Sequence, residues 1–223
     1  MKDLKASRGK YLIQRLIELG ENETQDFKYA ISDARKIARS ISAFANNRGG
    51  CLLIGVKDNG AIAGVRNEED VYVVEQAGSM YCDPPQKLTF DAFRTDGATI
   101  VIRATVSEAA RRPVRVREAD GSRRAYIRVA DENIVAHPLM VRAWMNHRPQ
   151  DDILDETAWE ILDAVRNAAT PLPPEVLPML IHRSTAITNA TVVRLVNLGL
   201  LSFTYVTHRF RLVAVPESEL PIG

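Results

Sequence analysis

The sequence predicts an α/β (α+β) domain built on a mixed β-sheet, followed by a small domain of three helices and a β-hairpin. Residues 1–147 alternate segments of strand and helix periodicity, whereas the pattern changes to mainly helical segments in residues 148–223. The polar, proline-containing stretch RPQDDILDE separates the two patterns. We therefore place one domain at residues 1–147 and the other at residues 148–223.

The first third of the chain alternates helix and strand signals. Apolar residues at helical spacing predict a helix that ends at Gly20, and QDFKYAI predicts a short strand after it. A second helix is expected from Asp33, with Ile37, Ile41 and Phe44 on one face. The unbroken apolar run CLLIGV then predicts a strand covered on both faces, and KDNG predicts a turn that returns AIAGV as its hairpin partner.

The rest of the first domain is expected to add strands. DVYVVEQAGSMY predicts a helix that stops at CDPPQ, because proline restricts the residue before it. Four segments are typical of strands separated by turns, namely LTFDAF, TIVIRATV, PVRVRE and RAYIRV. PLMVRAWMNH predicts one more helix before the boundary.

The second domain begins with DETAWEILDAVRNA, a predicted helix that buries Trp159, Ile161, Leu162 and Val165. PPEVLPMLI predicts a short second helix. A third helix is expected with Ser184 or Thr188 as its N-cap and Gly199 at its end. SFTYVTHRFRLVA then predicts a two-stranded hairpin.

Composition indicates an ordinary globular protein. Apolar residues make up 46% of the chain and charged residues 26%, and the net charge is +1. No segment has the apolar length of a membrane span, and two cysteines are too few for a disulfide framework. We therefore expect a cytoplasmic protein with no membrane partner.

Arginine is concentrated in two segments of this nearly neutral chain. Residues 111–128 hold seven arginines against two acids, and residues 182–211 hold four arginines and no acid. Such stripes favour a partner that carries phosphates, although a solvated strand face would have the same composition. The candidate contacts in the first segment are Arg111, Arg112, Arg115, Arg117, Arg123, Arg124 and Arg128.

The order of elements after residue 153, with the segment VVRLVNLGLLSF, resembles a winged helix-turn-helix domain. The resemblance implies a recognition helix that docks by its apolar face and offers polar side chains to nucleic acid. The implied contacts are Thr188, Asn189, Arg194, Arg209 and Arg211. A winged helix used only for dimerisation or protein contact remains the alternative.

The first domain resembles the Schlafen AlbA-like domain. The resemblance rests on E-x4-D-F-K at residues 21–28, on AFANNRGGCLLIGVKDNG after it, and on RRPVRV and RAYIRVADENIVA further on. It implies nucleic-acid binding and, in the Schlafen branch, metal-dependent cleavage of structured RNA. It also implies a homodimer, because two such lobes are joined in the animal proteins.

The branch's active-site acids correspond here to Glu21, Asp26 and Asp58. The resemblance implies that they hold a divalent metal, Mg²⁺ or Mn²⁺, while Lys28 offsets charge on the phosphate; both are roles that these residue types can fill. Asp26 departs from the family pattern, which usually has glutamate, and so leaves catalysis in question. Asp26 and Lys28 are two apart in a predicted strand, so their side chains should leave by the same face, with Phe27 opposite.

Three functional interpretations follow from these patterns. The first is a nucleic-acid-binding protein that acts as a metal-dependent endoribonuclease through Glu21, Asp26, Lys28 and Asp58. The second is a non-catalytic, DNA-binding transcriptional regulator that uses the winged helix. The third possibility is that both domains serve protein contact. No other cofactor is expected, because the chain has no P-loop sequence.

Overall fold

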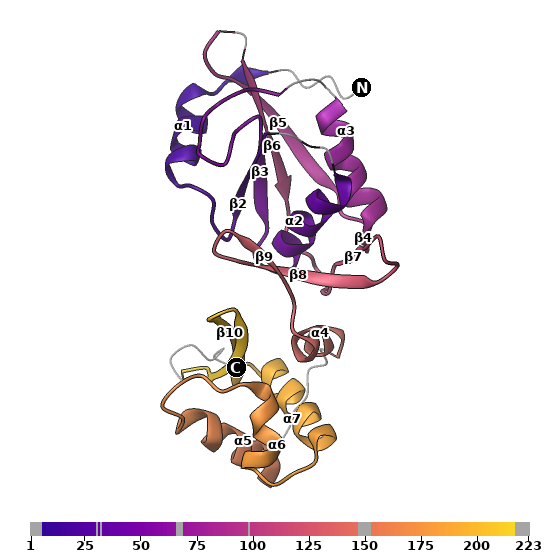
Figure 1. Ribbon diagram of the computed structural model, residues 1–223, viewed down its shortest axis with the longest axis vertical. Coiled ribbons are helices and arrows are strands. Elements are labelled where there is room, and N and C mark those ends of the chain that lie inside the picture. The colour runs from indigo at the N-terminus through magenta and orange to yellow at the C-terminus, as the bar shows by residue number, and fades with distance from the viewer. Residues whose placement is uncertain are drawn as a thin grey trace. The chain divides into compact units, whose positions relative to one another are not determined.

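A computed structural model describes residues 6–29, 31, 33–65, 69–97, 99–146 and 153–216 (Figure 1). The chain forms two compact units, Met1–Ala136 and His137–Gly223. The division falls earlier than the residue 147 that the sequence indicated. Helix α4 (Pro138–Met145) belongs to the second unit, because its buried residues Leu139 and Ala143 join that unit's apolar core.

The first unit is built on a mixed five-stranded sheet of order β1-β5-β6-β3-β2. β2 pairs with β3 and β1 with β5 in parallel, whereas β6 pairs antiparallel with both β3 and β5. The predicted mixed sheet is thus confirmed. Its strands are β1 (Ser7–Arg8), β2 (Gln25–Lys28), β3 (Gly50–Ile54), β5 (Leu88–Arg94) and β6 (Ile100–Val106).

Helices cover both faces of this sheet (Figure 1). Helices α2 (Ala34–Asn46) and α3 (Glu69–Gln76) contribute to the larger core, which includes Leu52 and Ile54 of β3. Helix α1 (Lys10–Glu18) contributes Ile13 to the other core, which includes Leu53. Strand β3, which lies between β6 and β2, is therefore covered on both faces, as its unbroken apolar run predicted. Residues 61–65 return only as an isolated bridge between Val56 and Ile62, and the strand partners of β3 are β2 and β6.

A second sheet of four strands, β4-β7-β8-β9, follows a π-helical segment, η1 (Ala77–Tyr81). Its strands are all antiparallel to their neighbours. Hydrogen bonds from Ser42 and Asn46 attach this sheet to α2. The strands are β4 (Cys82–Asp83), β7 (Arg115–Arg117), β8 (Arg123–Val129) and β9 (Glu132–Val135).

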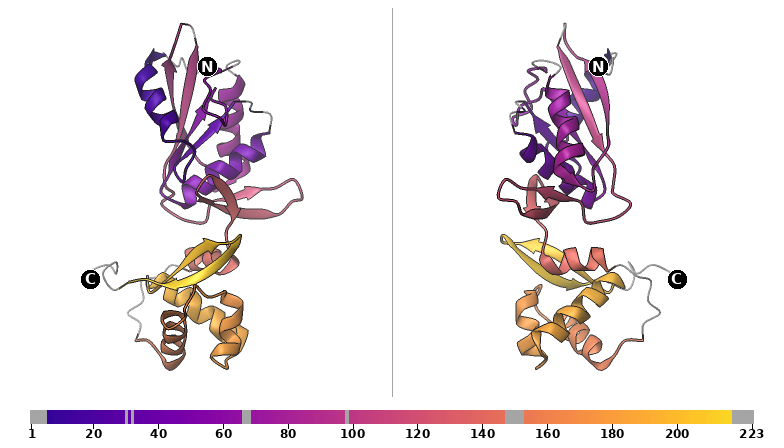
Figure 2. Two further views of the ribbon diagram at one scale, coloured as in Figure 1. Left: turned by 60° about the vertical axis from the view of Figure 1, so that its left-hand side comes forward. Right: turned by 90° about the vertical axis from the view of Figure 1, so that its right-hand side faces the viewer.

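The second unit consists of helices followed by a β-hairpin, which is a winged-helix-like ending (Figure 2). Asp155 caps helix α5 (Glu156–Arg166) and Ser184 caps helix α7 (Thr185–Asn197), each through a side-chain oxygen that accepts a backbone N–H group. Thr207 and His208, both with positive φ, form the tight turn of the hairpin. Its elements after α4 are α5 (Glu156–Arg166), η2 (Pro174–Val176), α6 (Leu177–Leu180), α7 (Thr185–Asn197), β10 (Leu201–Val206) and β11 (Arg209–Ala214).

One predicted core residue of this unit is wrong. Ile161, Leu162 and Val165 are buried as expected, but Trp159 is 49% exposed. Ala158 takes the buried position instead, because the face of α5 that meets the core is centred on Ala158, Ile161, Leu162 and Val165.

Among the described residues, no helix is long and apolar enough to cross a bilayer. Helices α2 and α7 have 13 residues each, whereas a helical span needs about 20.

Candidate functional site

Strand β2 presents Asp26 and Lys28 on one face and Phe27 on the other. Lys28 Nζ donates to Asp26 Oδ1 at 2.8 Å, and Phe27 is buried in the core that contains Leu53. This is the arrangement that strand alternation predicts. The charged face of β2 points toward α2, because Ser40 of that helix also contacts Asp26.

Asp26 is a buried carboxylate with both oxygens engaged. Its side chain is 3% exposed. Oδ1 receives Lys28 and lies 3.2 Å from Arg128 Nη2, and Oδ2 accepts from Ser40 Oγ at 2.9 Å. Burial by itself would raise the pKa of Asp26, but the hydrogen bond with Glu21 and the charges of Lys28 and Arg128 outweigh it, so its pKa lies below the ordinary value.

Glu21 is the second carboxyl group of this cluster. Glu21 Oε1 accepts the backbone N–H of Phe27 at 2.8 Å, and its side chain shares a hydrogen bond with Asp26. Burial, and then Asp26, raise the pKa of Glu21 to about 7. Glu21 and Asp26 therefore hold a proton between them below about neutral pH, with the charge remaining on Asp26.

Arg128 was predicted to contact nucleic acid, but the structure buries it. Its side chain is 1% exposed. The guanidinium donates from Nε to Asn22 O at 3.2 Å and from Nη1 to Asn133 Oδ1 at 3.1 Å, and it lies over the Phe44 ring. Arg128 lies on the face of β8 that packs against α2, so it stabilises Asp26 and is closed to a phosphate.

Asp58 does not join the other two acids. In the parallel register of β2 and β3, Asp26 lies opposite Leu52 and Lys28 opposite Ile54. Asp58 comes four residues after Ile54, so it lies beyond the paired part of β2 and β3, in an exposed turn. In the described part of the chain, no group of three or more His, Cys, Asp or Glu side chains is placed to hold a metal ion.

The donors that are present fit a divalent cation poorly. A hard cation needs carboxylate oxygens that can leave their other partners, with room for water and phosphate around it. Asp26 is closed off and already neutralised by two cations, Lys28 and Arg128. Binding of Mg²⁺ or Mn²⁺ by Glu21, Asp26 and Asp58 stays a prediction, and we derive no catalytic step from it.

Two asparagines that sequence reasoning passed over hold the second sheet in place. Asn46 Nδ2 donates to Val114 O and to Tyr126 O, each at 2.9 Å, and its Oδ1 accepts from Val114 N at 2.7 Å. Asn47 Nδ2 donates to Arg128 O at 2.7 Å. Adjacent asparagines at the end of a buried helix were the available signal, since a buried amide needs several partners.

The glycines that follow serve the same junction. Gly49 has φ +78° and its N–H donates to Phe44 O at 2.9 Å, which ends the helix. A Cβ atom at Gly50 would lie 2.5 Å from Phe44 Cδ1. The NNRGG segment therefore ends the helix and joins it to β3.

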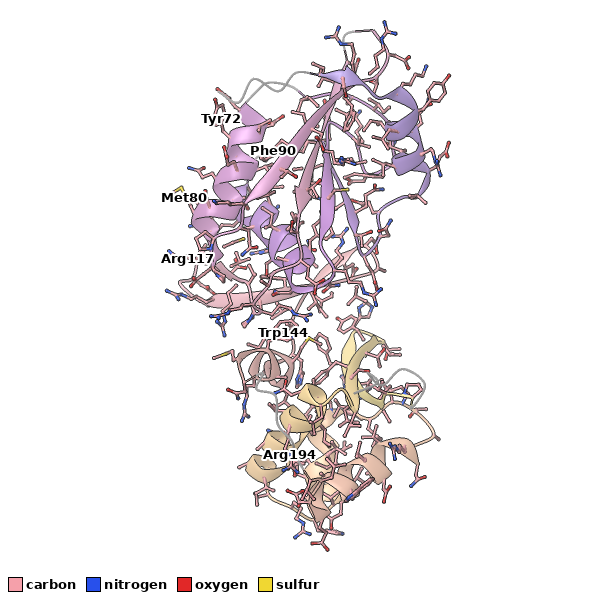
Figure 3. All side chains as sticks on the ribbon, turned by 180° about the vertical axis from the view of Figure 1, so that it is seen from behind. Tyr72, Met80, Phe90, Arg117, Trp144 and Arg194 are labelled. Carbon is pink, nitrogen blue, oxygen red and sulfur yellow. The ribbon has the colours of Figure 1, made fainter. Side chains whose placement is uncertain are left out.

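The β7–β8 hairpin carries three arginines on one face, of which Arg117 and Arg123 are exposed and Arg115 is half-buried. Arg117 lies opposite Arg123 in the antiparallel register, and Arg115 is two residues before Arg117, so these three side chains share one face. Figure 3 shows Arg117 at the edge of the unit, among nitrogen-tipped side chains. Arg124 lies opposite Val116, on the other face of the hairpin.

Glu118, at the end of β7, is turned away from this surface. It is 8% exposed and receives Arg39 Nη2 at 2.7 Å, Arg39 Nε at 3.0 Å, and the hydroxyl of Tyr126. These contacts, with Arg39 first, hold the pKa of Glu118 below its ordinary value despite burial. An inward carboxylate leaves the positive charge of the hairpin exposed.

The other arginines of residues 111–128 differ in their partners. Arg123 pairs with Asp83 and Arg124 with Asp120, each at 2.8 Å, and Arg112 donates to Asn46 O at 3.1 Å. Arg111 and Arg117 are exposed, and neither has an ion pair within the described ranges. Exposed ion pairs are weak and exchange easily, so Arg123 and Arg124 can still turn to a phosphate.

Helix α7 offers little to nucleic acid. Thr188 is fully buried and its hydroxyl donates to Ser184 O at 3.0 Å. Arg194 is held by Asp155 at 2.9 Å, and Asn189 is half-buried. The exposed positions of the helix include Ala186, Ile187 and Ala190. Thr188 cannot read a base, because its position on the helix faces the core that buries Val192 and Leu195.

The hairpin of the second unit is more open. Arg209 is exposed and Arg211 is half-buried, and neither has an ion pair among the residues that the structure describes. Of the three arginines predicted to contact nucleic acid in this unit, Arg194 is paired with Asp155, whereas Arg209 and Arg211 have no ion pair among the described residues.

Comparison with known proteins identifies the first unit. The chain belongs to the Schlafen AlbA_2 family, whose pattern matches residues 21–137. No curated protein sequence matches the chain.

Two solved structures are similar to this chain. One is the DIP2311 protein from Corynebacterium diphtheriae, with 19% identity and a TM-score of 0.42, over 85% of this chain and 34% of that one. The other is the N-terminal domain of a RecG-related protein from Nitrosomonas europaea, with 16% identity and a TM-score of 0.42, over 67% of this chain and 96% of that one. The chain thus spans about a third of the length of the first of these proteins.

Proposed function

We propose that this protein binds nucleic acid, and that the first unit does so through the exposed arginines of the β7–β8 hairpin without cleaving the strand. The observation that carries this proposal is the shared face of Arg115, Arg117 and Arg123, with Glu118 turned inward. Arginine suits phosphate, because its guanidinium can donate two parallel hydrogen bonds to it, and Arg117 and Arg123 of this face are exposed.

The resemblance to the Schlafen AlbA-like domain implies nucleic-acid binding, and membership of the Schlafen AlbA_2 family supports the same function. The nearly neutral chain makes a general polyelectrolyte attraction small. Binding therefore has to depend on the local charge of the hairpin, and we expect a small number of phosphate contacts.

Fluorescence anisotropy with labelled RNA and DNA, titrated at several salt concentrations, tests this proposal. The variant is Arg117→Ala, which removes an exposed side chain that has no ion pair in the described structure. Each phosphate contact contributes about 0.7 to 0.9 to the slope of log affinity against log salt, so the variant should bind more weakly and with a slope smaller by about 1.

Arg15→Ala is the matched control, since it removes the same charge from helix α1 on the opposite face of the sheet. It should leave both affinity and slope unchanged. Equal losses in the two variants, or a wild-type affinity that does not depend on salt, would remove the hairpin as the binding surface.

The cleavage hypothesis is separated from binding by a second assay. Labelled structured RNA is incubated with the protein in Mg²⁺, in Mn²⁺ and in chelator, beside the variants Asp26→Asn and Asp58→Ala. We expect intact RNA in every case. Metal-dependent cleavage that either substitution abolishes would overturn the non-catalytic part of the proposal and restore the metal site.

A further inference from the structure

The β10–β11 hairpin carries aromatic side chains on one face. Its register places Tyr205 opposite Phe210 and Phe203 opposite Leu212, and opposite residues of an antiparallel pair share a face. Leu212 is buried in the core of the second unit and Phe203 packs against that core. Phe203 and Leu212 therefore belong to the apolar core. Tyr205 and Phe210 lie on the same face of the hairpin, closer to the turn.

The rings contact one another in edge-to-face or tilted pairs. Tyr205 and Phe210 have centroids 5.0 Å apart and planes at 64°, and Phe203 and Phe210 lie at 87°. His208 of the turn meets Tyr205 at 85°, and His137 meets Phe203 at 30°. None of these ring pairs is a parallel stack. A parallel stack is the contact that a flat nucleobase makes with an aromatic side chain.

The charge of the hairpin is positive only. Residues 201–214 contain two arginines and a histidine but no acid. Arg209 and Arg211 lie opposite Val206 and Thr204, on the face behind the rings. Elsewhere in the unit, Arg183 is paired with Glu160 and Arg194 with Asp155.

A purely structural role for the rings is the simplest alternative. It accounts for Phe203 and for the contact of His137 with Glu175 at the far end of the ring cluster. It does not account for the exposed Arg209 near a half-buried Tyr205, in a hairpin without any carboxylate to balance its charge.

We propose that the tip of this hairpin binds single-stranded nucleic acid, with an unpaired base stacked on Tyr205 and the phosphates of the same strand on Arg209. A flexible single strand that crosses the turn can meet both faces of a two-stranded ribbon, whereas a duplex keeps its bases stacked inside. Sequence-tolerant single-strand binding combines aromatic side chains, which stack on the bases, with arginines, which contact the phosphates. The inference deepens the proposed function and rests on it.

The test uses the full chain and three labelled DNA ligands of equal length: a single strand, a duplex, and a single strand with abasic sites. Tyr205→Ala should weaken binding of the normal single strand about tenfold, because stacking on one aromatic side chain contributes about that much affinity per base. It should leave binding of the duplex and of the abasic strand at the wild-type level.

Tyr11→Ala, an exposed tyrosine on α1, is the matched control and should change none of the three affinities. Tyr205→Leu keeps apolar volume at the hairpin and should show the same selective loss, which separates stacking from folding. An unchanged affinity for the normal strand, or an equal loss on the abasic strand, would overturn the inference.

This outcome is distinct from failure of the β7–β8 proposal. Arg117→Ala is expected to weaken all three ligands, because it removes a phosphate contact that each of them offers. Arg117→Ala could have no effect while Tyr205→Ala weakens binding of the normal single strand alone. That result would reject the β7–β8 hairpin as a binding surface and support the β10–β11 hairpin as the binding site.

Discussion

The two ends of strand β8 use the same residue type for opposite purposes. At one end, Arg128 is 1% exposed and holds the buried carboxylate of Asp26. At the other end, Arg123 is exposed and lies opposite Arg117, which has no ion pair among the described residues. The segment RRPVRVREADGSRRAYIR gives no local sign of this difference.

The comparison teaches that an arginine-rich stripe is not a single surface. Strand alternation places Arg128 toward α2 and Arg117 away from it, and the contacts on each side then decide the role. A buried arginine with several acceptors organises the fold, whereas an exposed one without a partner is available to a ligand.

The largest effect is expected from Arg128→Met. Removing this cation leaves Asp26 buried with only Lys28 to offset its charge, and losing one partner of a buried ion pair costs about 3 kcal/mol or more. Urea unfolding at neutral pH, followed by far-UV circular dichroism, should show this loss in the transition of the first unit.

Arg117→Met is the control, and its expected change in the free energy of unfolding is under about 0.5 kcal/mol, as for most surface positions. The chain also contains an internal check. Both tryptophans, Trp144 and Trp159, lie in the second unit, so the fluorescence transition should not move in either variant. A similar loss of stability from both substitutions would break the comparison.

An intermediate effect is expected from Asn46→Ala, which sharpens the comparison at the buried end. The substitution leaves the N–H of Val114 without its partner and removes the bond to Tyr126 O. Unsatisfied buried groups of this kind cost about 2 kcal/mol in total stability. The same unfolding experiment applies, with Asn167→Ala at the exposed end of α5 as the control. A change below about 0.5 kcal/mol would show that Asn46 does not clamp β8 to α2.

The smallest effect concerns pH. The pKa of Glu21 in the folded protein is about 7, above its ordinary value of 4.5. Between these values the folded state binds more protons than the unfolded state, so this group's contribution to stability is present below about pH 4.5 and is lost as pH rises toward 7. Because Glu21 is partly exposed, we expect a loss of about 1 kcal/mol over this window.

Glu21→Gln should remove this slope, and Glu23→Gln, an exposed neighbour, should retain it. Asp26 does not interfere in this window, because its lowered pKa gives a contribution to stability that is constant above its ordinary pKa of 3.8 and is lost only at lower pH. Parallel stability profiles for wild type and Glu21→Gln would show that the carboxyl pair does not hold a proton near neutrality.

Much of the fold could be predicted from local pattern. The strand period placed Asp26 and Lys28 on one face, the apolar run of residues 51–56 indicated a covered strand, and Ser184 was a predicted cap of its helix. Trp159 was predicted to be buried because the spacing of apolar residues indicates the buried face of a helix only approximately. A shift of that face by one residue moves a side chain from the core to the solvent.

The candidate site was harder to predict because its members come together through pairing of distant segments. Glu21 and Asp26 meet across a short loop, which their spacing allowed. Asp58 was expected beside them, but the register of β2 on β3 moves it past the end of the pair. The tie between Asp26 and Arg128 joins residues about a hundred positions apart, beyond any local pattern.

The sequence by itself determined the alternation of helices and strands, the caps, the turn residues and the order of the two units. These properties depend on neighbours within a few positions, so short-range periodicity and backbone preference are sufficient to specify them. Only the tertiary structure decided which arginines are buried, which acids share a proton, and which hairpin faces stay open. Those outcomes depend on strand register and on what packs above each face, and both arise from contacts between segments that are remote along the chain.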